Sequence, residues 1–142
     1  MVVVTGRLSS MPEDECRDLL RGGKIGRVSV TYDALPVIAP VNYVLDGSSI
    51  IFRTRRDGML ASACDETVIA FEIDELAADG SSGWSVNVVG VASLLGPGEH
   101  VRALSLGLVS AAGDDRDQFV RLRMGLVSGR RIMPLETFAS NA

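Results

Sequence analysis

Six runs of β-branched and apolar residues, separated by short turn sequences, are the feature that most restricts the fold of this chain. Such residues favour extended strands, and turn formers mark where strands end. The first three runs are joined by turns of a few residues, at Tyr32-Asp33-Ala34-Leu35-Pro36 and Asp46-Gly47-Ser48. Turns of this length connect antiparallel neighbours, so we predict a meander rather than parallel crossover units. The runs cover residues 25–32, 36–45, 48–54, 67–74, 83–95 and 117–127.

Three further segments have helical composition. Residues 11–21 follow the potential capping hydroxyls of Ser9-Ser10, begin with a proline and three acids, and precede two glycines. These are the signals of a helix start and a helix end. Residues 58–64 suffice for two turns, and residues 99–112 for a longer helix. An antiparallel sheet with few helices has edges to cover, and closing into a barrel covers them. We therefore predict a mainly β protein built on a six-stranded antiparallel barrel.

Length and charge narrow the classes of function. A chain of 142 residues forms one domain, 1–142, and is too short for separate cofactor and substrate domains. With 14 basic and 18 acidic residues it has no overall positive field to attract nucleic acid or anionic lipid. No run reaches the length of a membrane span, and two isolated cysteines indicate no disulfide framework or metal cluster. We expect a cytoplasmic protein without nucleic-acid or membrane partners.

The segment from Ile50 to Leu60 has the chemistry of an anion site. An apolar strand ends in Arg53, Thr54, Arg55 and Arg56 and then turns into a predicted helix. Alternate residues of a strand share a face, a guanidinium presents a fork of donors, and a helix start offers backbone N–H groups. The alternative is a solvated charged turn. Pro40, inside the second run, indicates an edge strand, a bulge or a contact of the backbone with another group.

The order of several short segments resembles the flavin-binding families of the pyridoxamine 5′-phosphate oxidase-like superfamily. The similarity extends over residues 10 to 135 and is greatest for the small family members, which include nitroimidazole-reductase-like proteins. Each segment alone is weakly specific, but the ordered set is more so. The segments are Gly26-Arg27-Val28, Pro40-Val41-Asn42-Tyr43-Val44, Ile51-Phe52-Arg53-Thr54, Phe71-Glu72-Ile73-Asp74, Gly83-Trp84-Ser85-Val86 and Ser128-Gly129-Arg130-Arg131-Ile132.

The resemblance implies a split β-barrel over about residues 25–132, which forms a homodimer with FMN at the subunit interface. It implies that Arg53 and Thr54, with Arg55 and Arg56 nearby, meet the phosphate or ribityl chain. It further implies that the remaining site residues line the isoalloxazine or approach it from the partner subunit. The first group comprises Pro40, Val41 and Asn42, and the second comprises Trp84 and Ser85.

One position departs from the family pattern. A lysine commonly follows the glycine after the arginine-threonine pair, and here the matching stretch is Asp57-Gly58-Met59. A thioether cannot donate a hydrogen bond to a phosphate, so Arg55 or Arg56 would have to substitute. A deazaflavin, another anionic ligand or the absence of any cofactor are the alternatives to FMN.

No other residues form a convincing catalytic group. His100 is the sole histidine, which argues against a metal site or a Ser-His-Asp triad, and Cys16 and Cys64 fit apolar helix faces. Glu72 and Asp74 alternate along one strand, as expected of a charged outer face. Arg121 and Arg123 alternate likewise, and with Arg130-Arg131 they fit a solvated face, a dimer interface or a second anion contact.

From these observations we expect a homodimeric, FMN-dependent oxidoreductase. It would pass electrons from a donor such as a reduced nicotinamide to a small organic substrate, because a flavin carries such chemistry with little help from acids or bases of the protein. The chain resembles the small family members rather than the longer oxidase, which argues against oxidation of pyridoxamine 5′-phosphate itself. The alternative is a non-catalytic dimer that binds flavin, deazaflavin or another ligand for storage or sensing, or that has lost its cofactor.

Overall fold

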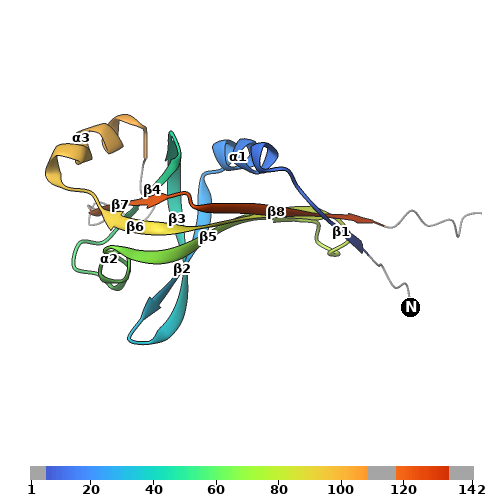
Figure 1. Cartoon of the computed structure of the whole chain (residues 1–142), viewed down its shortest axis with the longest axis horizontal. Helices are drawn as coiled ribbons and strands as arrows, with labels where there is room; N and C mark the ends of the chain where they lie inside the picture. The colour runs from blue at the N-terminus through green and yellow to red at the C-terminus, as the bar shows by residue number, and fades with distance from the viewer. Residues whose placement is uncertain (1–5, 109–117, 135–142) are drawn as a thin grey trace, which may run out of the picture.

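The computed structural model describes residues 6–108 and 118–134, which form a mainly antiparallel β-structure with three helices (Figure 1). The strand order is β1-β8-β6-β5-β2-β3-β4-β7, and an additional pairing of β6 with β7 closes six strands into a barrel. The predicted six-stranded antiparallel barrel is thereby confirmed. The strands are β1 (Gly6–Ser10), β2 (Ile25–Tyr32), β3 (Leu35–Asp46), β4 (Ser49–Thr54), β5 (Thr67–Leu76), β6 (Gly83–Leu94), β7 (Gln118–Arg123) and β8 (Leu126–Pro134).

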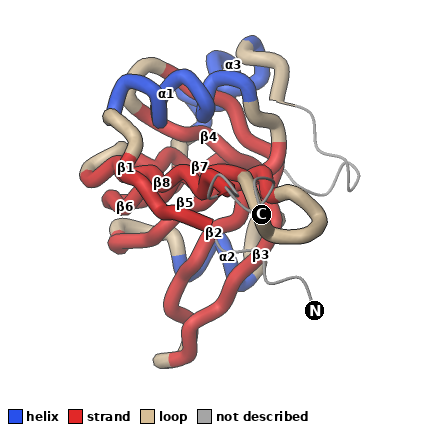
Figure 2. The backbone as a smooth tube through the Cα atoms, turned by 90° about the vertical axis from the view of Figure 1, so that its right-hand side faces the viewer, coloured by secondary structure: helices blue, strands red, loops and turns tan. Residues whose placement is uncertain are grey.

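The first three predicted strands form the expected meander. Strand β3 pairs antiparallel with β2 on one side and with β4 on the other. The β2–β3 turn has Asp33 and Ala34 at φ angles of 50° and 63°, the left-handed conformation that two-residue hairpin turns require. This hairpin extends away from the barrel at the bottom of Figure 2.

The last predicted strand, 117–127, is interrupted in the structure and continues further than expected. Met124 and Gly125 form a bulge in the pairing with β6, and β7 and β8 run in the same direction on either side of it, so that β7 closes the barrel and β8 continues along β6 into an arm. Strand β1 was missed, and with it the place of Ser9 and Ser10, which pair with β8 instead of capping a helix. Short strands whose faces are both solvated lack the alternation that reveals a half-buried strand.

Strand β6 is shared between the barrel and an extended arm. Its first part, residues 83–89, pairs with β8, and its last part, residues 92–94, pairs with β7. The change of partner occurs at Gly90, where a Cβ atom would lie 1.8 Å from the carbonyl oxygen of Arg123. Only glycine allows the two backbones to approach this closely. The arm carrying β1 and β8 extends to the right of the barrel in Figure 1.

The three helices cover different parts of the barrel. Helix α1 (Glu13–Gly22) buries Cys16 and Leu20 against the main core, and the Tyr43 hydroxyl donates a 2.6 Å hydrogen bond to the Leu20 carbonyl. Helix α2 (Met59–Ala63) links β4 to β5. Helix α3 (Pro97–Ser105) follows β6 and is shorter than predicted, although part of the predicted range, residues 109–112, lies outside the described residues.

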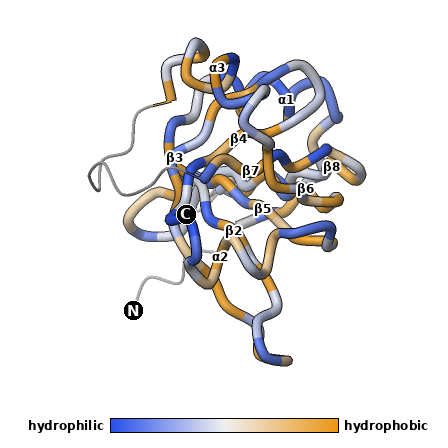
Figure 3. Tube along the Cα trace, turned by 90° about the vertical axis from the view of Figure 1, so that its left-hand side faces the viewer, coloured by the Kyte–Doolittle hydropathy of each residue, from blue (hydrophilic) through white to orange (hydrophobic). Residues whose placement is uncertain are grey.

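Helix α3 explains why β4 is buried on both faces. Ile50 and Phe52 point into the barrel, whereas Ile51 points outward into a second core under α3. An uninterrupted apolar run is typical of a strand covered on both sides. The hydropathy-coloured trace in Figure 3 shows this apolar character along β4. The second core consists of Ile51, Leu95, Ala103, Leu108 and Phe119.

Candidate functional site

The predicted site residues of β3 and β4 lie side by side on the outside of the barrel. Tyr43 lies opposite Phe52 in the last pair of the β3–β4 ladder, so Asn42 and Arg53 are the residues that adjoin this end of the pairing. Pro40 and Asn42 are two residues apart and therefore share this face. Arg53 in turn lies opposite Phe119 of β7. The structure thus places Asn42 and Arg53 at the same end of the β3–β4 pairing, with Pro40 two residues further along β3, although eleven positions of sequence separate Asn42 from Arg53.

Pro40 lies in a half of β3 that has one neighbour. Within the described part of the chain, residues 35–42 pair only with β2, where Pro40 is opposite Arg27, and the pairing with β4 begins at Tyr43. The edge-strand interpretation of Pro40 is therefore confirmed. The other edge of this half-strand presents backbone groups next to the exposed Pro40 and the half-buried Asn42, whereas the Val41 side chain points into the core.

Arg53 has a defined environment on this face. Its guanidinium carbon lies 5.1 Å from the centre of the Phe119 ring, and its Nη1 donates to the Leu108 carbonyl over 3.4 Å. The residue as a whole is half-buried. An arginine ordered in this way is suited to hold an anion, because its donors are directed before the ligand arrives.

The other polar residues of the predicted anion segment are arranged differently. Thr54 is only 3% exposed and belongs to the inward-facing positions of β4. Arg55 and Arg56 are exposed in the turn that follows. Arg56, Gly58, Ser62 and Gln118 line an open pocket of about 280 Å³ at the start of α2. Polar groups therefore continue from Arg53 around the end of the barrel.

Met59, at the position where a lysine was expected, packs against the main core. It is the first residue of α2, whose remaining buried residues are Leu60, Ala61 and Ala63. The side chain is half-buried, so the position serves packing in this protein. The nearest cationic side chains in the sequence belong to the exposed residues Arg55 and Arg56.

Trp84 and Ser85 lie on the arm, away from Arg53. They pair with Glu75 and Asp74 of β5 on one side and with Arg131 and Arg130 of β8 on the other. Trp84 shares the inward face with Val86 and packs against the main core. Ser85 is on the outward face, and the chain alone does not bring either residue to the Arg53 site.

The outward faces of five strands carry an exposed patch that is apolar except at Ser29 of β2. One line of paired residues crosses the sheet as Leu126, Val89, Ala70, Ser29 and Ile38. The next line adds the pair Val68 and Val91. Five of these side chains are more than a third exposed, with values of 74% for Leu126, 71% for Ile38 and 66% for Val68. We call Leu126, Val89, Ala70, Ile38, Val68 and Val91 the apolar patch. Patches of this kind mark surfaces that meet another protein.

A charged cluster borders the apolar patch. Nη1 of Arg27 lies 3.1 Å from both the Glu72 and the Asp74 carboxylates. Glu72 and Asp74 therefore do lie on an outer strand face, as predicted, but sequence inspection did not identify Arg27 as their partner. Burial, and then the adjacent Asp74 carboxyl, raise the pKa of Glu72, while Arg27 opposes this effect. Arg27, Glu72, Ile38 and Ala70 also line a shallow pocket of about 220 Å³.

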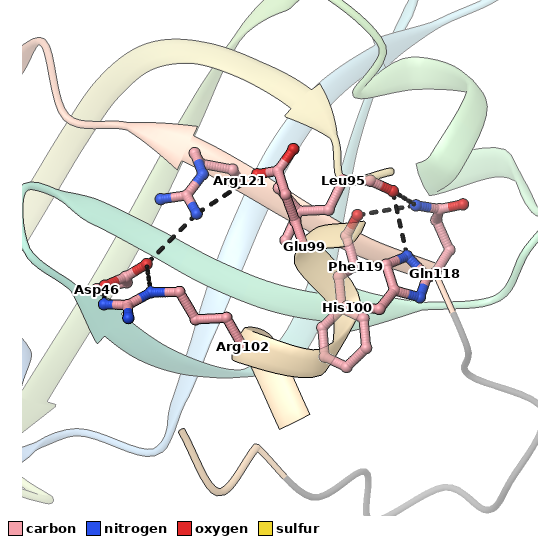
Figure 4. Close-up of polar contacts among 8 residues, drawn as sticks. All are labelled: Asp46, Leu95, Glu99, His100, Arg102, Gln118, Phe119 and Arg121. Carbon is pink, nitrogen blue, oxygen red and sulfur yellow. Dashed lines mark hydrogen bonds and ion pairs between the residues drawn. The ribbon is translucent and has the colours of Figure 1, made fainter. Parts of the chain in front are cut away.

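Packing and ion pairs with neighbouring residues account for most of the other candidate residues. Nε2 of His100 lies 3.1 Å from the Leu95 carbonyl oxygen, and its ring meets Phe119 edge-on (Figure 4). Arg121 contacts Asp46, and Arg131 forms an ion pair with Glu15 of α1. Arg121 and Arg123 also line an open pocket of about 360 Å³ beside Glu66 and Ser93. Cys16 and Cys64 are buried thiols, and burial raises the pKa of Cys64 to about 12.

Metal clusters and membrane-spanning helices are both absent from the described ranges, residues 6–108 and 118–134. No cluster of three or more histidine, cysteine or acidic side chains there is arranged to hold a metal ion. No helix in these ranges has the length and apolar character needed to cross a membrane.

Comparison with known proteins gives matches over nearly the whole chain. A family model described as pyridoxamine 5′-phosphate oxidase matches residues 12–131. The uncharacterized protein Rv0080 of Mycobacterium tuberculosis is 33% identical over 128 residues, which cover 87% of this chain and 84% of that protein.

Solved structures of similar proteins have the same fold. The FAD binding protein from Mycobacterium smegmatis is 29% identical, with a TM-score of 0.67 over 88% of this chain and 98% of that one. A conserved protein of unknown function from Corynebacterium diphtheriae is 28% identical, with a TM-score of 0.73 over 87% and 96% of the two chains.

Proposed function

Because the chain belongs to the pyridoxamine 5′-phosphate oxidase family, we propose that it binds a flavin on the outer face of β3 and β4 and acts as a cytoplasmic oxidoreductase. The observation that carries this proposal is that Pro40 and Asn42 lie in the half of β3 that, among the described residues, pairs only with β2, and that Arg53 adjoins the end of the β3–β4 pairing on the same outer face. The similar protein from Mycobacterium smegmatis is an FAD binding protein, which supports a flavin as the ligand.

The residues of this face fit the two chemically different parts of a flavin. The Arg53 guanidinium suits a phosphate, because it offers several directed donors and a full positive charge. Pro40 and the backbone of the half-strand offer a flat, partly apolar surface with hydrogen-bonding groups, which suits the edge and plane of a tricyclic ring. The amide of Asn42 lies between these two regions and can donate or accept.

When bound, the flavin supplies the redox chemistry: it accepts two electrons, from a donor such as a reduced nicotinamide, and passes them to a small organic acceptor. The residues of the chain then have three tasks. Arg53 would hold the phosphate, Asn42 would orient the flavin, and Pro40 would contact one side of the ring system and exclude water there. None of these tasks requires a nucleophile or a residue that moves protons.

We further propose that the apolar patch is the interface of a homodimer. Its exposed valines, Ile38 and Leu126 form one self-complementary band, as a two-fold interface needs. Asn42 is paired with Ile25 at one end of the outward face, and Ser85 is paired with Asp74 toward the other end. A two-fold axis between these ends exchanges them, so Ser85 of the partner approaches the flavin face. The proposed dimer would in this way account for the implied contribution of the Trp84-Ser85 segment from a second subunit.

The first experiment is an absorption spectrum of the purified protein, before and after incubation with FMN or FAD, with the released cofactor identified by mass. We expect bound flavin, and the mass distinguishes FMN from FAD. Arg53→Gln should weaken FMN binding about 10- to 100-fold, the equivalent of one charge-assisted hydrogen bond. The matched control is Arg123→Gln, an exposed arginine of β7 outside the proposed site. Equal effects of the two substitutions would contradict the site assignment.

A non-catalytic flavin-binding dimer is the second candidate, and the packing of Met59 against the core favours it, because the chain lacks the lysine expected for tight phosphate binding. Anaerobic mixing with NADH or NADPH separates the candidates. Bleaching of the flavin absorption, followed by recovery on addition of an acceptor, supports the oxidoreductase. A spectrum that dithionite bleaches but neither nicotinamide changes supports the binding protein.

A further inference from the structure

The Phe119 ring is held between Arg53 on one side and helix α3 on the other. It is 2% exposed and lies opposite Arg53 in the pairing of β4 with β7. The Arg53 guanidinium carbon is 5.1 Å from the ring centre, within the range of a cation–π contact. The same guanidinium donates to the carbonyl of Leu108, which follows α3. Two contacts of different kinds therefore restrict the Arg53 side chain.

His100 restricts the ring from the side of the helix (Figure 4). The His100 and Phe119 rings meet edge-on, with centres 5.1 Å apart and planes inclined by 70°. The imidazole Nε2 lies 3.1 Å from the Leu95 carbonyl oxygen, to which the Gln118 amide also points over 3.4 Å. The imidazole is thus tied to the end of β6, and this fixes the edge against which Phe119 packs.

We infer that Phe119 is a positioning residue for Arg53, with His100 and α3 as its support, and that together they direct the guanidinium toward the flavin phosphate. The inference rests on the proposed function and adds residues that do not touch the ligand themselves. An arginine side chain has many rotamers, and a ligand that must order it binds more weakly than one that finds it already ordered. The Phe119 ring and the Leu108 carbonyl supply this order in advance.

The inference predicts an effect specific to the phosphate. Riboflavin has the same ring system and ribityl chain as FMN but lacks the phosphate. Losing the aromatic ring at position 119 should therefore weaken FMN binding and leave riboflavin binding unchanged. A substitution that merely loosens the second core should affect both ligands alike, because that core underlies the whole outer face of β4.

The experiment compares Phe119→Leu with Leu95→Val, a control in the same core whose side chain is not part of the Arg53 contacts. For Phe119→Leu we expect the FMN dissociation constant to rise about three- to fivefold, with no change for riboflavin. Phe119→Tyr retains the ring face and should restore FMN binding. In combination with Arg53→Gln, Phe119→Leu should cause no additional loss. Equal losses for both flavins, or additive losses in the double variant, would overturn the inference.

A second readout needs no flavin. In the ligand-free protein, the NMR signal of the Arg53 Nε–H group should carry a ring-current shift from Phe119, and Phe119→Leu should remove the shift and increase the mobility of the group. An unchanged Arg53 signal in the variant would overturn the inference. If the wild-type protein binds neither FMN nor riboflavin, the proposed function fails, and the Arg53 signal alone then decides whether Phe119 orders this side chain.

Discussion

At the scale of single residues, Met59 occupies the position where the family resemblance led us to expect a lysine. Its side chain packs on the core at the start of α2, close in sequence to the polar groups that follow Arg53. A lysine at this position can place its methylene stem along the same apolar surface and extend its ammonium group to the solvent. Position 59 therefore tests whether the phosphate lies at this end of the barrel.

We expect Met59→Lys to tighten FMN binding about tenfold or more, through one added charge-assisted hydrogen bond. Calorimetric titration of the variant with FMN and with riboflavin measures the change, and riboflavin affinity should stay constant. Met59→Gln is the control, since it is polar and of similar length but carries no charge. No gain for the lysine variant would indicate that the phosphate is bound elsewhere.

At the scale of elements, helix α3 is attached to the barrel by an ion-pair cluster at one side and by the His100–Phe119 contact at the other (Figure 4). Asp46, at the end of β3, accepts hydrogen bonds from Arg102 of α3 and from Arg121 of β7. The bidentate contact with Arg102, and then Arg121, hold the pKa of Asp46 below its ordinary value. The ionised form of Asp46 therefore stabilises the attachment of α3.

The contribution of Asp46 to the free energy of unfolding should decrease as the pH falls. A carboxyl group whose pKa is lowered by folding contributes stability above its unfolded pKa and loses it as the pH falls through the folded value. Asp46→Asn should therefore lower the free energy of unfolding at pH 7, and its difference from the wild type should shrink as the pH falls below about 4. Denaturant titrations at pH 7 and pH 3 measure this. Asp65→Asn, at an exposed position, is the control, and a difference that does not change with pH would contradict the assignment.

At the scale of the whole molecule, exposed apolar residues lie both on the apolar patch and on helix α3. Val68 of the apolar patch and Val101 of α3 are both valines with similar exposure, 66% and 73%. Only Val68 belongs to a continuous band across several strands. The proposed dimer therefore predicts different consequences for the same substitution at these two positions.

Val68→Asp should convert the dimer into a folded monomer, with a dissociation constant about 100-fold higher or more, because burying an unpaired carboxylate costs several kcal/mol. Val101→Asp should leave the dimer intact. Sedimentation velocity over a range of protein concentrations measures both, and circular dichroism confirms that each variant is folded. If Val101→Asp dissociates the dimer and Val68→Asp does not, the interface involves α3 instead.

Much of the barrel follows from local sequence patterns. β-branched runs and short turns predicted β2 to β6 with ends that differ from the structure by at most two residues, because half-buried strands and tight hairpins depend on neighbouring residues. The family and the barrel were also identified correctly from the order of short segments. The division of the last run into β7 and β8, and the extension of β8 to Pro134, were not predicted, because a bulge is set by the pairing with β6 and not by a local turn signal.

The sequence by itself determined the strands of the meander, the apolar character of the core and the presence of arginines after β4, since these depend on residue type and spacing. Tertiary structure alone decided that Asn42 and Arg53 adjoin the same end of the β3–β4 pairing, that Phe119 contacts both Arg53 and His100, and that Arg27 joins Glu72 and Asp74. These residues lie 11 to 66 positions apart in the sequence. They exist because the strand register and the closure of the barrel at Gly90 bring distant segments together, and no local pattern encodes either.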